Sequence, residues 1–293
     1  MSQPLVSIAM PVYNCEKTLA QAIRSILLQT FQDWEFIIIN DGSTDKTMDI
    51  AQSFDDPRIR VFADGEQKGL PMRLNEAVKE SRGKYIARMD GDDIAYPRRL
   101  ERQLAYMKEH PEVDLVGAGI LVFGFEGVAL GKRVGGKIPR RRSAIVGGSI
   151  PIAHPTFFGK TEWFTQNRYS VWPKNFQDQH LLLQTLSTSV LRVLPEILLG
   201  YREERLSLRK QIRYRLSYLQ STRQLMRSLG PSLAASLISV QMFKLVLDVF
   251  AISTGLKYRV LRHRAMPVTR LEAAEWSQVW QAVGVPVRQE PHF

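Results

Sequence analysis

The feature that most constrains this chain is a regular alternation of short strand patterns with helical patterns over its first 110 residues. The strand patterns cover residues 6–10, 36–39, 59–62 and 85–89. The helical patterns cover residues 18–29, 47–54 and 72–80, and Pro97 stands at a favoured first-turn position of a further helix. Repeated β-α-β units of this kind predict an α/β protein with a doubly wound, mostly parallel sheet.

The middle of the chain, residues 113–199, is mixed in pattern. Glycines punctuate its first apolar stretch, as expected of bent or bulged strands. A helical pattern at residues 181–186 and a strand pattern at residues 190–194 follow.

The C-terminal part differs from the rest in both pattern and charge. Helical spacing begins at residue 201, so we expect a domain over residues 1–200 and a basic, mainly helical extension over residues 201–293. The extension holds 15 Lys and Arg against 6 Asp and Glu, which accounts for most of the net charge of +11. Such asymmetry predicts an anionic partner, with lipid, nucleic acid and phosphate-bearing substrates as the alternatives. Lys244 and Asp248 lie within its most apolar stretch and argue against a bilayer span.

The cellular location is constrained only by small features. The N-terminus lacks a basic stretch followed by a long apolar run, so we expect no secretory signal. The single cysteine, Cys15, excludes an internal disulfide framework and fits a reducing compartment.

Three polar clusters follow the first, second and fourth strand patterns. They occupy residues 11–14, 40–45 and 90–93. Open α/β sheets bind ligands in the crevice beyond the carboxyl ends of their strands, so these clusters predict one shared site.

The third cluster holds three carboxylates within four residues, Asp90, Asp92 and Asp93. Carboxylates this close repel each other unless a cation or hydrogen-bond donors compensate. Oxygen ligands suit Mg²⁺ or Mn²⁺, which commonly bridge a carboxylate to a diphosphate. The alternative is a solvated acidic turn that caps the helix beginning near Pro97.

Two other classes of nucleotide-binding protein are excluded because their glycine-rich phosphate loops are missing. A dinucleotide-binding oxidoreductase needs Gly-x-Gly-x-x-Gly there, but residues 11–14 contain no glycine. A Gly-x-x-x-x-Gly-Lys-Ser/Thr loop is also absent from the sequence, and no nucleic-acid-binding module is evident.

Several motifs resemble those of glycosyltransferase family 2 in order and spacing. They are residues 11–14, 39–45, 83–93, 97–100 with Gln103, and 154–156, and the resemblance extends over residues 4–200. It implies the A-type glycosyltransferase fold. It also implies an inverting, metal-dependent transferase (EC 2.4, hexosyltransferase type) that moves sugar from a nucleotide-sugar to an acceptor hydroxyl. The implied acceptor is a lipid-linked or growing glycan in polysaccharide or glycoconjugate assembly.

The resemblance assigns the nucleotide-sugar pocket to Pro11, Tyr13, Asn14, Asp41, Lys68, Arg73, Asp90 and Gly91. Asp41 would bond the base, Asp90 would contact the ribose or support the metal, and Asp92 and Asp93 would hold Mg²⁺ or Mn²⁺. Three alternatives stay open: Asp41 caps the next helix, Tyr13 packs in the core, and Asp93 caps a helix or supports the metal ligands.

The family's catalytic base is matched by Asp178. A positioned carboxylate takes the proton of the attacking hydroxyl in an inverting displacement. Here Gln177 replaces the usual Glu, which removes a charge that would raise the pKa of Asp178. The alternative is that Asp178 is an N-cap of the helix at residues 181–186.

The acceptor and diphosphate side is assigned to His154, Arg140 and His180. Each has a structural alternative: a hydrogen-bonded core histidine for His154 and His180, and a solvated basic face for Arg140.

For the extension we expect contact with an anionic membrane surface, which would make the protein cytoplasmic and peripheral at the inner face of the cell membrane. A helical subdomain or a homodimer contact is the alternative. The competing function is a degenerate transferase-fold protein that binds a membrane or nucleic acid, although no nucleic-acid partner is expected.

Overall fold

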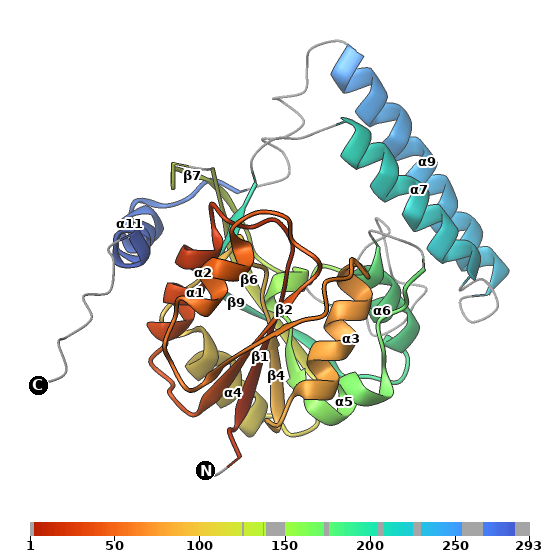
Figure 1. Ribbon diagram of the computed structural model, residues 1–293. Helices are drawn as coiled ribbons and strands as arrows, with labels where there is room; N and C mark the ends of the chain where they lie inside the picture. The colour runs from red at the N-terminus through yellow and green to blue at the C-terminus, as the bar shows by residue number, and fades with distance from the viewer. Residues whose placement is uncertain are drawn as a thin grey trace, which may run out of the picture.

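The computed structural model describes residues 3–124, 126–136, 138, 150–172, 176–203, 208–224, 230–253 and 266–284. Within these ranges the chain forms one nine-stranded sheet with helices on both faces (Figure 1). The predicted α/β class and doubly wound architecture are therefore confirmed.

The strands are β1 (Val6–Val12), β2 (Trp34–Asn40), β3 (Ile59–Ala63), β4 (Tyr85–Arg88), β5 (Ile94–Ala95), β6 (Leu115–Phe123), β7 (Ala129–Arg133), β8 (Phe158–Lys160) and β9 (Leu191–Arg202). Their order is β3-β2-β1-β4-β8-β6-β9-β5, with β7 beside β6. The half made by β3, β2, β1 and β4 is parallel throughout. Strand β8 is antiparallel to both of its neighbours, β4 and β6, so the sheet as a whole is mixed.

The α-helices are α1 (Leu19–Leu27), α2 (Thr47–Gln52), α3 (Leu70–Glu80), α4 (Arg99–Glu109), α5 (Thr161–Gln166), α6 (Gln177–Thr185), α7 (Leu208–Gln224), α9 (Pro231–Ser253) and α11 (Arg270–Gly284). A 3₁₀ turn, η2, covers His154–Thr156. Each strand and helix expected in the first 110 residues is present. The helix expected from residue 201 is wrong at its start, because β9 continues to Arg202.

Strand β2 shows why continuous apolar runs occupy the centre of the sheet. Phe36 and Ile38 pack into a core shared with α1 and α4 on one face. Ile37 and Ile39 pack into a second core with α3 and α6 on the other. Successive side chains of a strand point to opposite faces, so a strand covered on both sides must be apolar at every position.

A long-range pairing fixes the loop that carries the carboxylates. Strand β5 pairs antiparallel with the end of β9, with Ile94 opposite Gly200. The residues just before Ile94 are therefore held against the end of β9, which comes much later in the chain.

The C-terminal helices occupy two different places. Helices α7 and α9 lie side by side as a hairpin that stands out from the domain beside α6, whereas α11 lies across the molecule near α1 and β7 (Figure 1). Within the described ranges, no helix combines the length and hydropathy that crossing a bilayer requires.

Candidate nucleotide-sugar and metal site

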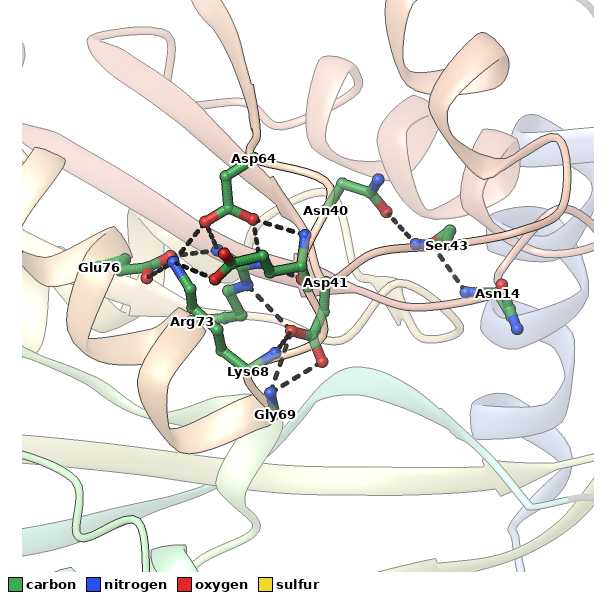
Figure 2. Close-up of polar contacts among 10 residues, drawn as sticks. Asn14, Asn40, Asp41, Ser43, Asp64, Lys68, Gly69, Arg73 and Glu76 are labelled. Atoms are coloured by element: carbon green, nitrogen blue, oxygen red, sulfur yellow. Dashed lines mark hydrogen bonds and ion pairs between the residues drawn. The ribbon is translucent and has the colours of Figure 1, made fainter.

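The first two polar clusters meet at the carboxyl edge of the sheet. The Asp41 N–H donates to Val12 O at 2.8 Å, which continues the β1–β2 pairing past the strand ends. Asn14 has a φ of 49°, and this turn lets its N–H donate to Ser43 Oγ at 3.0 Å. Figure 2 shows this contact between the two loops. Tyr13 is 44% exposed, so its side chain is available to a ligand and does not pack in the core.

Asp41 anchors the start of α3. Its Oδ1 accepts hydrogen bonds from Lys68 N at 2.7 Å, Gly69 N at 3.0 Å and Arg73 Nε at 2.9 Å (Figure 2). The helix that follows Asp41 in sequence, α2, instead begins with Thr47 N donating to Asp45 Oδ1. Asp41 therefore holds together two loops from different β-α units, which the capping alternative did not anticipate.

Arg73 and Lys68 face carboxylates beyond Asp41. Arg73 is buried and bridges Asp64 at 2.6 Å and Glu76 at 2.7 Å. Lys68 Nζ lies 2.5 Å from Asp64 Oδ2. The pKa of Asp64 is lowered, first by its hydrogen bonds to Arg73 and then by those to Lys68. These ion pairs form a network of acidic and basic side chains next to Asp41.

The third cluster brings three carboxylates together. One oxygen from each of Asp90, Asp92 and Asp93 lies within 4.8 Å of the others. Asp93 is fully buried; its Oδ1 accepts from Arg202 N at 3.0 Å, while among the described residues its Oδ2 has no hydrogen-bond partner. An unpaired buried carboxylate oxygen is costly unless a cation completes it. The donor set therefore fits a hard divalent cation such as Mg²⁺ or Mn²⁺.

Burial and mutual repulsion of these carboxylates also raise their pKa values. Burial, followed by the charges of Asp92 and Asp90, raises the pKa of Asp93 well above its usual range. Asp92 lies at the surface, yet desolvation and then the charge of Asp90 raise its pKa to about 6. Uncompensated negative charge of this kind is what a metal ion relieves.

Two groups hold the loop in place from either side. A Cβ on Gly91 would lie 2.9 Å from Val12 Cγ1, so the glycine lets the loop pack against the end of β1. Arg202 Nε donates to Asp92 O at 2.8 Å, and its guanidinium lies 4.7 Å from the ring centroid of Phe123 and 5.8 Å from that of Trp280. Sequence reasoning missed Arg202 because its position was assigned to a helix. The apolar run before it was the available strand signal.

Arg88 pairs with one carboxylate of this cluster. It is buried and forms an ion pair with Asp90, with Nη1 2.5 Å from Oδ2. Among the described residues of this cluster, Asp90 is the one that forms a salt bridge, whereas Asp92 and Asp93 form none.

Asp178, His154 and Tyr169 lie in the same electrostatic neighbourhood. Asp178 is the second residue of α6, after Phe176 at the N-cap position, and burial raises its pKa. His154 Nε2 lies 3.1 Å from the Tyr169 hydroxyl. Burial raises the pKa of Tyr169, and Arg88 lowers it while Asp178 and Asp90 raise it. Tyr169 was not predicted, since an isolated tyrosine carries no sequence signal.

The predictions for His180, Arg140 and Pro11 have three different outcomes. His180 is buried, and its Nδ1 lies 2.7 Å from Ser221 Oγ, so it joins α6 to α7 as the structural alternative expects. Burial lowers its pKa. Arg140 lies outside the described residues. Pro11 belongs to β1 and is buried.

This geometry defines a class: a doubly wound α/β domain that gathers a three-carboxylate loop and a second carboxylate at the carboxyl edge of its parallel strands, as in A-type glycosyltransferases. The model of glycosyl transferase family 2 matches residues 7–165, which is more than half of the chain. The chain therefore belongs to glycosyl transferase family 2.

Curated relatives match mainly in this part of the chain. EpsE of Bacillus subtilis (strain 168) is 41% identical over 158 residues, covering 53% of this chain and 56% of that protein. The UDP-Glc:alpha-D-GlcNAc-diphosphoundecaprenol beta-1,3-glucosyltransferase WfgD of Escherichia coli is 39% identical over 107 residues, covering 36% of this chain and 42% of that protein. The chain thus matches about half the length of these relatives.

Solved structures share the fold over nearly the whole chain. The mannosyltransferase PcManGT of Pyrobaculum calidifontis, in complex with GDP-Man and Mn²⁺, has a TM-score of 0.60 at 16% identity and covers 97% of this chain and 87% of its own. TarS 1–349 of S. aureus, in complex with UDP-GlcNAc, has a TM-score of 0.58 at 17% identity and covers 95% and 81%. At these identities the likeness establishes the fold.

Proposed function

We propose that this protein transfers a sugar, with inversion, from a metal-bound nucleotide-diphosphate sugar to an acceptor hydroxyl in polysaccharide or glycoconjugate assembly. The observation that carries the proposal is the loop of Asp90, Asp92 and Asp93, whose buried Asp93 Oδ2 lacks a partner among the described residues. It lies at the ligand-binding edge of a family 2 domain.

The donor occupies the joined loops of the first two clusters. Asn14 and the exposed Tyr13 belong to these loops, and among the described residues Asp41 Oδ2 accepts only the Gly69 N–H, at 3.0 Å. A carboxylate with spare acceptor capacity can bond the N–H groups of a base. The UDP-GlcNAc of TarS and the GDP-Man of PcManGT support a UDP- or GDP-sugar.

Asp92 and Asp93 would hold Mg²⁺ or Mn²⁺, which when bound neutralises the diphosphate as it leaves. The Mn²⁺ of PcManGT supports this choice of ion. Arg88 keeps Asp90 ion-paired and so limits the negative charge that the donor meets.

Asp178 is the proposed base. The acceptor oxygen attacks the anomeric carbon from the face opposite the diphosphate, the bond to the diphosphate oxygen breaks, and the hydroxyl proton passes to the Asp178 carboxylate. Burial raises the pKa of Asp178, which makes its carboxylate a stronger base than a solvated aspartate. His154 and Tyr169, joined by their 3.1 Å contact, line the acceptor side next to it.

The acceptor class is a lipid-linked or growing glycan. Support comes from WfgD, whose name gives diphosphoundecaprenol-linked GlcNAc as its acceptor. Arg140 and the other basic residues of its segment are proposed to meet the acceptor diphosphate.

The test is turnover of a panel of UDP- and GDP-sugars with Mn²⁺, Mg²⁺ or a chelator, followed by NMR of the product's anomeric configuration. We expect one donor to turn over only with metal and to give the inverted anomer. Asp92→Asn and Asp178→Asn should each lower kcat/KM by about 10²-fold or more. Asp55→Asn, an exposed carboxylate at the opposite edge of the sheet, is the matched control and should leave it unchanged. Turnover that survives both site variants, or nucleic-acid binding without turnover, would contradict the proposal.

A further inference from the structure

The C-terminal half of α9 exposes a continuous apolar surface, here termed the outer face of α9. Its members are large aliphatic or aromatic side chains with exposed fractions from 46% to 65%: Met242, Phe243, Val246, Leu247, Val249 and Phe250. Single exposed apolar residues are ordinary, but a contiguous group of six marks an interaction surface.

The buried side of α9, opposite the outer face, packs against α7. Ala234, Leu237 and Gln241 lie on the other side of α9 and are buried. Gln241 Oε1 accepts a hydrogen bond from Arg215 of α7 at 2.7 Å. Met242, Val246 and Val249 follow helical i, i+4, i+7 spacing, and so do Phe243, Leu247 and Phe250, so both rows lie on one side of the helix.

The neighbouring helix α7 is rich in basic residues. Helix α7 contains five basic residues and no acidic residue, at Arg209, Lys210, Arg213, Arg215 and Arg223. Three of them lie in its first six residues. The start of α7 and the end of α9 lie at the same end of the hairpin (Figure 1), so the backbone of this basic segment lies near the outer face.

We propose that the outer face of α9 inserts into the surface of a bilayer that contains anionic lipid, with the basic start of α7 contacting the headgroups. The face runs about 12 Å along the helix at 1.5 Å per residue, which suits shallow insertion at the headgroup boundary. Two copies paired through this face would bring like charges of α7 together, whereas an anionic surface is complementary to them. The proposal goes beyond glycosyl transfer and does not depend on it.

The test is co-sedimentation of the full chain with vesicles of phosphatidylcholine, with or without about 30 mol% phosphatidylglycerol. We expect binding to the anionic vesicles that weakens as salt rises, because the headgroup contacts are screened. Phe243→Gln with Phe250→Gln should lower the partition coefficient by about tenfold or more, since both rings leave the interface. Both side chains are exposed, so the fold should persist, and an unchanged thermal transition checks this.

Leu271→Gln is the matched control, because Leu271 is a large apolar side chain of α11 that is 84% exposed. It should bind vesicles as the unsubstituted protein does, and so should Asp92→Asn, which separates this test from that of the transferase activity. Equal binding to vesicles with and without anionic lipid would overturn the proposal. So would a stable dimer that binds no vesicles and that the double variant converts to a monomer, because a second copy would then cover the face.

Discussion

Helices α9 and α11 both belong to the basic C-terminal part of the chain, yet their large apolar side chains differ in exposure. Helix α9 leaves its outer face exposed. Helix α11 buries Trp276, Val279 and Val283 against β5 and β6, and Trp276 is only 2% exposed. Apolar content alone therefore does not decide whether a helix joins the core.

The difference lies in the surface that receives each helix. A Cβ on Gly200 would lie 2.3 Å from Trp276, and one on Gly127 would lie 2.3 Å from Trp280. The sheet edge is thus shaped to admit two indoles, and Trp276 Nε1 donates to Gly127 O at 2.6 Å. We infer that α11 is an integral part of the catalytic domain, although residues 201–293 form one extension by sequence.

The largest test of this comparison is to remove one aromatic ring from each helix. Trp276→Ala should lower the free energy of unfolding by about 3–5 kcal/mol, because it opens a cavity in a packed cluster. Phe243→Ala on α9 should change it by less than about 0.5 kcal/mol, since that ring is exposed. Denaturant unfolding measures both. Similar losses in the two variants would mean that the outer face of α9 is covered in the folded protein.

The second test asks whether α11 acts on the metal loop through Arg202. Trp280→Ala removes a ring beside the guanidinium, and Arg202→Lys removes the Nε donor to Asp92 O. Each should weaken Mn²⁺ binding by about tenfold, which calorimetry measures without any turnover. Glu272→Gln is the matched control, because it loosens α11 at Lys132 without touching Arg202. Equal effects in all three variants would assign the loss to docking of α11 alone.

The third test uses pH to separate the catalytic domain from the hairpin. Asp178 must be deprotonated to accept a proton, and burial raises its pKa above the usual value for aspartate. On the acid side kcat/KM should therefore fall by about tenfold for each pH unit, and the fall should begin at a higher pH than for a solvated aspartate. Vesicle binding should stay constant over the same range, because arginine does not titrate there. If kcat/KM and vesicle binding changed in parallel with pH, one titrating group would control both.

The smallest expected effect belongs to the surface ion pair of α11. Lys132 Nζ lies 2.6 Å from Glu272 Oε1, and this contact lowers the pKa of Glu272. Glu272→Gln should lower the free energy of unfolding by about 0.2–1 kcal/mol at neutral pH, as for a partly exposed pair. Because the folded pKa is lowered, the difference should vanish as the pH falls through that pKa. A loss as large as that of Trp276→Ala would mean that charge, rather than packing, docks α11.

Much of the fold could be read from the sequence because its signals are local. The apolar run of β2 and the helical spacing of α1 reflect burial on two faces, and that requirement acts on every residue of an element. The three polar clusters could likewise be assigned to one edge, because parallel strands bring their carboxyl ends together.

The tertiary structure alone decided what depends on residues far apart in sequence. It put Arg202 against Asp92, Tyr169 beside His154, and Ser221 beside His180. It also separated α9 from α11, which composition had grouped together. The physical reason is that periodicity records whether a side chain needs burial, whereas the partner that provides it is set by the path of the whole chain.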